Sequence, residues 1–473
     1  MAFSKNDIPL TLDFNSTHGQ GSVVCGLLLR DLHGKRKVYK GLWGQRNVIV
    51  KLFLDPKAAH RHWGREKSGI EALKETSVPT PELLFAGDLK DGTPALIFDF
   101  LPEAQTALQV WNNLQTRVQR ADLQQHLIEV IASLHNAGVL QEDLHLDNFL
   151  VSGGKIYVID GDAIVNKGNG KALSNAVSNR NLALFFAQFP PKFDCLIDRT
   201  VQCYAELRNI PAADLLTSLS ADLAEARRRR RHKYVKKSYR SCSEFERSKF
   251  PGKIAIARRD QAGSALSQLL EDPDAFMALG TLLKDGKSST VVRVRGDHYD
   301  WVVKRYNVKS LWHRLRNCFR YTRAWISWGN AHRLKISGIA TPQAIAMIEK
   351  RFGPLRSSSY YVSEFTAGSH AGAFFRDDAT LAKEKQQAAR SFVELFEVLL
   401  KLRIHHGDCK ATNFLLQDLV PWILDLDAMC ECRYGARFER FYRIDRERFL
   451  RNWQELPELQ CWFDEHLPKK ELD

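Results

Sequence analysis

The chain of 473 residues lacks several features that define common protein classes. No apolar run reaches the roughly 18–20 residues that a membrane-spanning helix requires. The first residues include an Asp and no apolar signal-like segment, so we expect a cytoplasmic protein. The nine cysteines contain no CxxC pair, which favours reduced thiols over a disulfide framework or a zinc site.

Acidic side chains are too few to balance the basic ones. Lys and Arg number 69 against 55 Asp and Glu, which gives a net charge of +14. This excess favours an anionic partner: a phosphosugar, an acidic lipid surface or a nucleic acid. With 44% hydrophobic residues and this length, the chain is expected to form two or three soluble domains.

Two segments far apart in the chain repeat one polar pattern. The first reads VLQEDLHLDNFLVSGGKIYVIDGDA and ends at Ala163, and the second reads IHHGDCKATNFLLQDLVPWILDLDA and ends at Ala428. In each, an Asp precedes an Asn by five positions, and a second Asp follows the Asn by twelve. Two copies at identical spacing indicate a duplicated active-site plan, whereas a single copy is more often a capped loop.

The spacing of these Asp and Asn residues is typical of kinase-type phosphoryl transfer. The first Asp would take the proton of an acceptor hydroxyl, and the Asn with the second Asp would supply the oxygen ligands that Mg²⁺ prefers. We therefore predict catalytic residues and metal ligands in each half. The catalytic residues are Asp143 and Asp408, and the metal ligands are Asn148, Asp160, Asn413 and Asp425.

A lysine at the end of an apolar strand is the third requirement of this chemistry. Lys51 ends VIVK and Lys304 ends WVVK, and each could reach the α- and β-phosphates of ATP. Glu66 could orient Lys51 from a following helix, with Glu71 as a second candidate. Aligning LKETSVPTP with LKISGIATP places Ser327 opposite Glu66. Either another acid pairs with Lys304, or the second site is impaired.

Loops that cover phosphates are usually rich in glycine, and here they are not. The corresponding stretches, 32–37 and 284–290, contain only Gly34 and Gly286. Gly34 and Gly286 are the candidate nucleotide contacts, and basic and hydroxyl side chains could substitute for the missing amides, but a surface hairpin fits equally well.

Strand-like and helix-like patterns alternate in the same order twice, which predicts an α+β chain of two tandem bilobal domains. A helix is also expected directly after each Asp-x-x-x-x-Asn loop. The predicted strands are 38–42, 47–53, 96–100, 291–295, 301–306 and 360–365, and the predicted helices are 123–137 and 388–402. The predicted domains are 1–240 (N-lobe about 20–100, C-lobe about 101–240) and 241–473 (N-lobe about 241–365, C-lobe about 366–473).

An unbroken arginine run, 227–231, lies near the predicted boundary. Such a run is usually a solvated helix face or an exposed linker. The alternative is a cradle for a phosphorylated or lipid-bound substrate.

These motifs resemble the protein-kinase-like superfamily. VYKGLWGQRNVIVK looks like the β2–β3 region of a kinase N-lobe, and HHGDCKATN is similar to the catalytic loop of aminoglycoside phosphotransferases. The chain more closely resembles the lipopolysaccharide core (Kdo/heptose) kinases, through SWGNAHRLKISGIATP, KKSYRSCSEF and the HGDxxxxNFLL…LDLDA ending. Two features depart from the pattern: Gln141 replaces a His common in kinases, and no Asp-Phe-Gly occurs.

The resemblance implies two protein-kinase-like domains that use ATP and Mg²⁺ to phosphorylate a heptose or Kdo hydroxyl. It implies lipopolysaccharide core or a lipid-linked phosphosugar as partner, and peripheral contact with the anionic cytoplasmic face of the inner membrane. Two alternatives stay open: a tandem pseudokinase scaffold, and a small-molecule phosphotransferase. Nucleic-acid binding is disfavoured because the arginine run lacks a recognisable reading module. The sequence leaves the sugar and the oligomeric state open.

Overall fold

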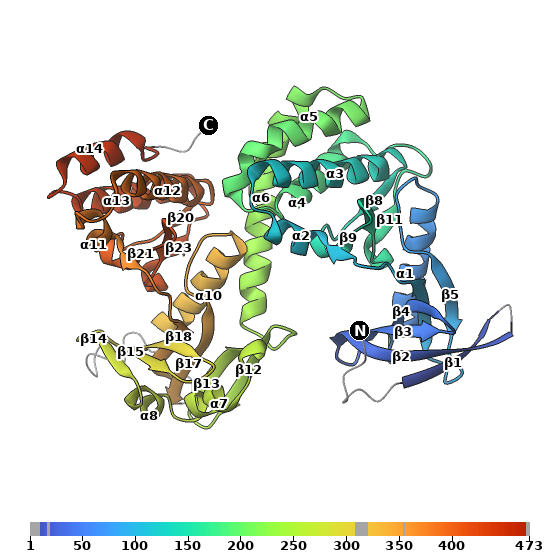
Figure 1. The fold of residues 1–473 in the computed structure, drawn as a ribbon, viewed down its shortest axis with the longest axis horizontal. Coiled ribbons are helices and arrows are strands. Elements are labelled where there is room, and N and C mark those ends of the chain that lie inside the picture. The colour runs from blue at the N-terminus through green and yellow to red at the C-terminus, as the bar shows by residue number, and fades with distance from the viewer. Residues whose placement is uncertain (1–9, 17–18, 308–319, 353–354, 470–473) are drawn as a thin grey trace. The chain divides into compact units, whose positions relative to one another are not determined.

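The computed structural model describes residues 10–16, 19–307, 320–352 and 355–469 (Figure 1). Within the chain, two compact units separate. Unit 1 comprises residues up to Phe189 and Phe193–Ala226, and unit 2 comprises Pro190–Lys192 and the chain from Arg227 onward. The content of helices and strands fits the predicted α+β class. The predicted boundary near residue 240 lies just beyond helix α6 (Ala212–Ser238), which contributes residues to both units.

Unit 1 begins with a six-stranded antiparallel sheet in the order β1-β2-β3-β4-β6-β5, against which helix α1 (Ala59–Lys74) packs. In β4, alternation buries Val48, Val50 and Leu52 on one face and turns Lys51 to the other. The strands are β1 (Leu10–Ser16), β2 (Gly19–Leu32), β3 (Arg36–Trp43), β4 (Arg46–Phe53), β5 (Leu83–Asp88) and β6 (Pro94–Asp99).

The rest of unit 1 is mainly helical. Its core is built on helix α3 (Arg117–Asn136), which starts at a capping box formed by Thr116 and Gln119. The other elements are β7 (Gln105–Thr106), α2 (Ala107–Asn113), β8 (Val139–Gln141), η1 (Leu146–Asn148), β9 (Phe149–Ser152), β10 (Lys155–Val158), η2 (Gly161–Ala163), β11 (Ile164–Asn166), α4 (Asn175–Phe186), η3 (Pro191–Leu196) and α5 (Ile197–Arg208).

Unit 2 also begins with an antiparallel sheet, here of seven strands in the order β12-β13-β17-β18-β16-β15-β14. Helix α10 (Arg323–Ile336) packs against β17 and β18. The strands are β12 (Phe245–Phe250), β13 (Lys253–Arg258), β14 (Thr281–Asp285), β15 (Ser289–Arg295), β16 (Asp300–Tyr306), β17 (Ala344–Phe352) and β18 (Leu355–Glu364). Between them lie η4 (Arg259–Gln261), α7 (Ser264–Glu271) and α8 (Pro273–Ala278).

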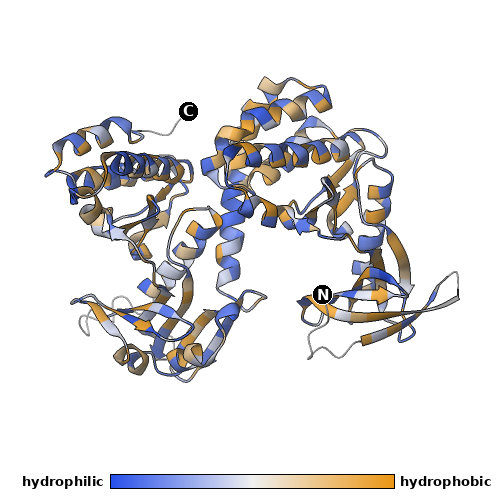
Figure 2. Ribbon diagram, viewed as in Figure 1, coloured by the Kyte–Doolittle hydropathy of each residue, from blue (hydrophilic) through white to orange (hydrophobic). Residues whose placement is uncertain are grey.

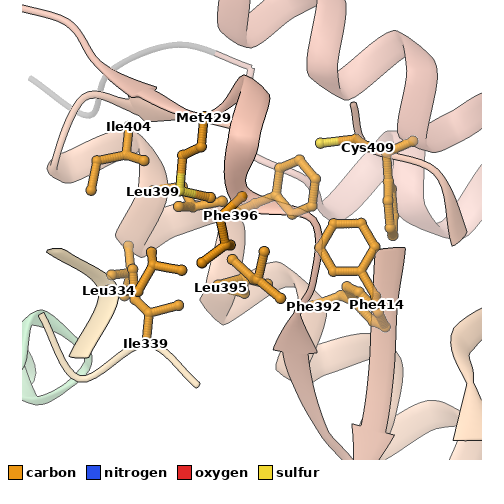
Figure 3. Packing of buried hydrophobic residues seen from close by; sticks show 14 of the residues in the cluster. Leu334, Ile339, Phe392, Leu395, Phe396, Leu399, Ile404, Cys409, Phe414 and Met429 are labelled. Carbon is orange, nitrogen blue, oxygen red and sulfur yellow. The ribbon is translucent and has the colours of Figure 1, made fainter. Parts of the chain in front are cut away.

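The helical part of unit 2 packs on α12 (Ala382–Lys401). Its residues Phe392, Leu395, Phe396 and Leu399 follow helical spacing and share one core with residues on both sides of the HGDxxxxN loop (Figure 3). The remaining elements are β19 (Ser369–His370), α11 (Ala371–Arg376), β20 (Ile404–His405), η5 (Ala411–Asn413), β21 (Phe414–Gln417), β22 (Val420–Ile423), η6 (Leu426–Ala428), β23 (Cys430–Glu431), α13 (Gly435–Arg451) and α14 (Pro457–His466).

Each strand and helix whose range was predicted is found, with ends that shift by up to six residues. The prediction of a helix directly after each Asp-x-x-x-x-Asn loop is wrong. Phe149 and Phe414 start strands instead, and each pairs with the strand that leads to the second Asp. Hydrophilic and hydrophobic residues are mixed along the ribbons (Figure 2), and no helix in the described residues is long and apolar enough to cross a bilayer.

The arginine run is helical, within α6, begins where the two units divide, and is only partly solvated. Arg227 and Arg231, one turn apart, are buried, whereas Arg228 and Arg229 between them are exposed. Arg231 Nη2 lies 2.6 Å from Glu431 Oε1, and Arg333 Nε lies 3.1 Å from the other oxygen of that carboxylate. The exposed-face interpretation is therefore wrong for Arg227 and Arg231, and Arg231 forms a buried ion pair within unit 2.

Candidate active site

In unit 1, four charged side chains meet between the sheet and α1. Lys51 on β4 forms an ion pair with Glu66 of α1, which is fully buried. Arg36, the first residue of β3, lies with Nη1 3.1 Å from Glu66 Oε2 and 3.6 Å from Asp160 Oδ1. Glu66, not Glu71, is therefore the partner of Lys51 in the structure. Lys51 and Arg36 thus join the sheet to the helix and to the second Asp of the motif.

Two glycines let α1 approach the turn that carries Asp160. A Cβ on Gly69 would lie 1.9 Å from the Gly161 carbonyl oxygen, and a Cβ on Gly161 would lie 2.3 Å from the Glu66 carbonyl oxygen. Arg65 Nε lies 3.1 Å from Asp162 Oδ1 at the same contact. The close backbone approach fixes Glu66 beside Lys51.

The loop of unit 1 brings its Asp and Asn together. Asn148 Nδ2 donates to the carbonyl oxygen of Asp143 at 2.9 Å. The backbone N–H of Ile159 donates to the Asn148 carbonyl oxygen at 3.0 Å, which ties the loop to the strand before Asp160. The Asp143 side chain is 58% exposed, and His145 Nε2 lies 3.3 Å from its Oδ1.

In unit 2, Lys304 has a different partner from its counterpart. Its Nζ lies 2.6 Å from Asp425 Oδ1. Ser327, at the place of the missing acid, hydrogen-bonds through its hydroxyl to the Tyr306 hydroxyl at 2.9 Å. Arg323, one turn earlier on α10, forms an ion pair with Asp427. The helix therefore reaches the Asp425–Asp427 turn through Arg323 rather than through a Lys–Glu pair.

The catalytic-loop Asp of unit 2 is more enclosed than that of unit 1, at 25% side-chain exposure. Asn413 Nδ2 donates to the Asp408 carbonyl oxygen at 2.9 Å and to its Oδ2 at 3.2 Å. Arg448 Nη2 lies 2.7 Å from Asp408 Oδ1, and Lys410 Nζ lies 3.4 Å from Oδ2. These contacts hold the Asp408 carboxylate in one orientation.

Family comparison supports a kinase assignment for this part of the chain. Residues 284–456 match the Lipopolysaccharide kinase (Kdo/WaaP) family. The matched Kdo/WaaP segment lies within unit 2 and includes Lys304, Asp408, Asn413 and Asp425. No curated protein matches the chain. The match supports a kinase, that is, phosphotransferase activity, and a place in lipopolysaccharide biosynthesis.

The Kdo/WaaP segment also contains two residues that hold the catalytic loop in place and that no sequence motif predicted. The buried carboxylate of Asp445, on α13, accepts the backbone N–H of His406 at 2.6 Å and that of Gly407 at 3.0 Å. Asn452 accepts the N–H of Ala411 at 3.1 Å. No local motif marks either residue, although the period of the apolar residues in α13 places Asp445 on the buried face.

His406 supports Asp408 as a neutral ring. The Asp408 backbone N–H donates to Nδ1 at 3.2 Å, and Nε2 contacts the Leu424 carbonyl oxygen at 3.1 Å. Both contacts are satisfied by the tautomer with its proton on Nε2. Burial lowers the pKa of His406 and so favours this neutral form. Gln141 occupies the same place in unit 1, where its amide has no hydrogen-bond partner among the described residues.

Opposing effects set the pKa values of the acidic groups. Burial raises the pKa of Glu66, although Lys51 opposes it. Burial also acts to raise the pKa of Asp160 and of Asp425, but Lys51 and Lys304, with their neighbours, bring both below the ordinary value. Burial and the charge of Asp425 raise the pKa of Asp427. The neighbouring cations thus favour the ionised form of the second Asp in each motif.

The donor chemistry of unit 2 fits Mg²⁺. Asp425 is ionised beside a second carboxylate, Asp427, and the N–H of Leu424 donates to the Asn413 carbonyl oxygen at 2.8 Å, which brings the two predicted ligands to adjoining backbone. The described residues hold no group of three or more His, Cys, Asp or Glu side chains arranged around one metal position. Mg²⁺ commonly takes one or two protein oxygens and completes its shell with phosphates and water.

The two glycines predicted to approach phosphates both lie in hairpins of the sheets. Gly34 has φ +69° in the turn between β2 and β3, a conformation that favours glycine. The Gly286 N–H donates to the Ser289 carbonyl oxygen at 3.0 Å between β14 and β15. Their contact with a nucleotide stays a prediction.

Proposed function

We propose that unit 2 transfers the γ-phosphoryl group of ATP to a heptose or Kdo hydroxyl of the lipopolysaccharide inner core. One observation carries the proposal. The segment that matches the Kdo/WaaP family holds a lysine–aspartate pair, Lys304 with Asp425, and a catalytic-type loop in which Asp408 and Asn413 are hydrogen-bonded. The acceptor sugar and the use of ATP and Mg²⁺ belong to this proposal.

Each side chain would have a distinct task in the transfer. Asp408 accepts a hydrogen bond from the sugar hydroxyl and takes its proton as the hydroxyl oxygen bonds to the γ-phosphorus and the bond from that phosphorus to the leaving ADP breaks. Lys304 would bind the α- and β-phosphates, and Asn413 and Asp425 would hold Mg²⁺. The metal, when bound, neutralises charge on the phosphates. Arg448 and Lys410 fix the carboxylate of Asp408 in place while its proton affinity changes.

The proposed partners are lipopolysaccharide core or a lipid-linked phosphosugar, reached at an anionic membrane surface. The net charge of +14 supports this, because clustered Lys and Arg are each worth on the order of 1 kcal/mol near such a surface. We place the protein on the cytoplasmic face of the inner membrane as a peripheral protein.

The test is phosphate transfer from radiolabelled ATP to extracted core oligosaccharide. Asp408→Asn should lower kcat by about 10²–10⁴-fold, because a positioned general base contributes that much. Asp418→Asn, a change of the same kind at an exposed turn of unit 2, is the control. Asp143→Asn measures the share of unit 1 in the same assay. Unaltered transfer in Asp408→Asn would show that the proposal for unit 2 is wrong, whatever the Asp143→Asn variant does.

A second function, that of a nucleotide-binding scaffold, is favoured for unit 1 alone. Gln141 cannot give the loop the two ring contacts that His406 gives in unit 2, and Asp143 is more than twice as exposed as Asp408. A chain whose Asp143→Asn variant keeps full transfer would support this division. A small-molecule acceptor remains the third proposal, and competition by free sugars against core oligosaccharide distinguishes it.

A further inference from the structure

We propose that unit 1 binds the phosphate chain of a nucleotide without a divalent cation, with the Arg36 guanidinium in the place of the metal. The proposal rests on the proposed function, in which both units are kinase-like. It concerns a site in unit 1, outside the segment that matches the Kdo/WaaP family. It assigns the ligand class, a nucleoside triphosphate, and the cation that neutralises it.

The position of Arg36 is the first step of the argument. It follows the hairpin that contains Gly34, which was predicted to cover the phosphates, and its side chain turns inward at 16% exposure. Its Nη1 lies between Glu66 Oε2 at 3.1 Å and Asp160 Oδ1 at 3.6 Å. Asp160 Oδ1 is buried and has no hydrogen-bond partner among the described residues. A guanidinium therefore lies at the carboxylate that was predicted to hold Mg²⁺.

Strand register shows that unit 2 lacks this cation. Lys51 pairs across the sheet with Val38, and Lys304 pairs with Val291. Two residues before each valine, unit 1 has Arg36 and unit 2 has Ser289, which is buried and uncharged. The same position in the hairpin therefore carries a fixed positive charge in unit 1 and none in unit 2.

Both sites hold cations beside the second Asp, since in unit 2 Lys304 Nζ lies 2.6 Å from Asp425 Oδ1 and Arg323 pairs with Asp427. Unit 1 differs in that its Arg36 comes from the hairpin that was predicted to cover the phosphates. Mg²⁺ approaching Asp160 would meet this guanidinium, and like charges in a partly buried site repel strongly. Nη1 of the guanidinium donates to Glu66, and among the described residues Nε and Nη2 make no hydrogen bond. Both of these nitrogens can therefore donate to phosphate oxygens. Arginine suits this task, because its planar fork matches phosphate geometry and keeps its charge. Lys51, beside it, adds a second cation.

The experiment measures nucleotide binding by unit 1 in the full chain. Lys304→Met is introduced throughout to remove the contribution of unit 2. A fluorescent ATP analogue is titrated in EDTA and in Mg²⁺. We expect dissociation constants within about threefold of each other in the two buffers, since the metal supplies under about 0.7 kcal/mol at this site. Binding that requires Mg²⁺, or no binding in either buffer, would overturn the proposal.

Substitutions of Arg36 give the second readout. Arg36→Ser should weaken binding in EDTA by about tenfold or more, because a hydrogen bond to a charged group is lost, and Mg²⁺ should restore part of it. Arg36→Lys keeps the charge, so its dissociation constant in EDTA should lie within a few-fold of that of the parent. If Arg36→Ser lowers the melting temperature, Arg36→Lys is the variant that tests the role of the charge. Arg46→Ser, the same change at an exposed position of the same sheet, is the matched control.

The outcomes separate this inference from the proposed function. Tighter binding by Arg36→Ser in EDTA would mean that Arg36 blocks the site, and would overturn the inference. Phosphate transfer by the chain with an intact Lys304 is measured in parallel. If nucleotide does not bind in EDTA but phosphate transfer is intact, only this inference is wrong. If nucleotide binds in EDTA but no phosphate is transferred, only the proposed kinase activity is wrong.

Discussion

The Asp445 carboxylate holds the catalytic loop of unit 2 from a helix that neither recurring motif includes. It accepts two backbone N–H groups, of His406 and Gly407, directly before Asp408. Hydrogen bonds to a charged acceptor are stronger than neutral ones, and a buried donor that loses its acceptor carries the full desolvation cost. The position of the catalytic carboxylate thus depends on a buried residue of α13.

We expect Asp445→Asn to lower both stability and transfer. The amide offers one acceptor oxygen in place of two and turns N–H donors toward N–H donors, so the free energy of unfolding should fall by about 2–3 kcal/mol. Urea unfolding followed by tryptophan fluorescence measures this, and kcat for core phosphorylation should fall with it. Glu447→Gln, an exposed acid on the same helix, is the control. A variant with unchanged kcat would show that the loop does not need this anchor.

At the residue level, the sequence predicted what spacing can encode. Asp408 and Asn413 are close in the chain, so their hydrogen bonds follow from one loop. The partner of Lys304 could not be predicted, because Asp425 lies far along the chain and only the fold brings the two within 2.6 Å. The inward turn of Arg36 was missed for the same reason. Arginine beside a glycine turn is common on protein surfaces, and nothing local marks its contact with Glu66.

Helix α1 depends on a close backbone contact with the Asp160 turn. We expect Gly69→Ala to destabilise unit 1 by about 1–3 kcal/mol, since overpacking of this size has that cost and a Cβ there would meet the Gly161 carbonyl oxygen at 1.9 Å. Separation of Glu66 from Lys51 should also weaken nucleotide binding. Differential scanning calorimetry of the full chain measures the first effect.

Gly64→Ala, on the same helix, is the matched control. A Cβ at Gly64 would meet no atom within 4 Å, so the substitution should stabilise the helix by up to about 1 kcal/mol through helix propensity. Equal effects of the two alanine variants would mean that α1 does not lie against the turn as the structure describes.

Helix α10 carries a buried imidazole that makes unit 2 sensitive to acid. Burial lowers the pKa of His332 to about 3, from an ordinary value of 6.5. Between these values the unfolded chain binds a proton that the folded chain does not, so stability is fully present above pH 6.5 and is lost as pH falls. The loss should be about 1.4 kcal/mol per pH unit below 6.5.

His332→Phe should flatten this dependence. The ring of His332 lies 4.4 Å from that of Trp328 and 4.8 Å from that of Phe245, so a phenyl ring suits its surroundings. Urea midpoints at pH 7 and pH 5, followed by tryptophan fluorescence, measure the change, with the exposed His298→Phe as control. An unaltered difference between the two midpoints would assign the acid sensitivity to other groups.

Elements were predictable where one pattern repeats over several residues. Alternation in 47–53 predicted β4, and the apolar period in 388–402 predicted most of α12. The helix expected after each loop failed because cross-strand pairing outweighs local preference: Phe149 pairs with Val158, and Phe414 with Ile423. The prediction of an exposed arginine run failed because residues four apart on a helix share one face, and Arg227 and Arg231 lie together on the buried face of α6.

Across the whole molecule, the charge of +14 should govern contact with membranes. We expect the chain to sediment with vesicles of anionic phospholipid at low salt and to be released as salt rises, because the Debye length shortens from about 10 Å at 0.1 M to about 3 Å at 1 M. Vesicles of phosphatidylcholine alone are the control. Equal sedimentation with both, or none with either, would contradict the proposed membrane partner.

At the scale of the whole molecule, the sequence predicted more than the family comparison tests. The repeated Asp, Asn and Asp pattern predicted two tandem domains, and the structure contains two compact units. The family match extends over residues 284–456 alone, so the tandem duplication remains a prediction for unit 1. The proposed division of roles between the units was not predictable from sequence, because Arg36 and Ser289 become comparable only through strand register.

Asp160 and Asp425 both adopt the left-handed backbone conformation, with φ of 71° and 52°. In this conformation a residue with a Cβ has a steric cost of about 1 kcal/mol or more, and glycine has no such steric cost. Asp425→Gly should relieve this strain but leave the Lys304 ammonium without its partner, so the two effects oppose each other in the melting temperature, whereas phosphate transfer should be lost. The strained turn is thus kept together with an ion pair that only a carboxylate can make at this position.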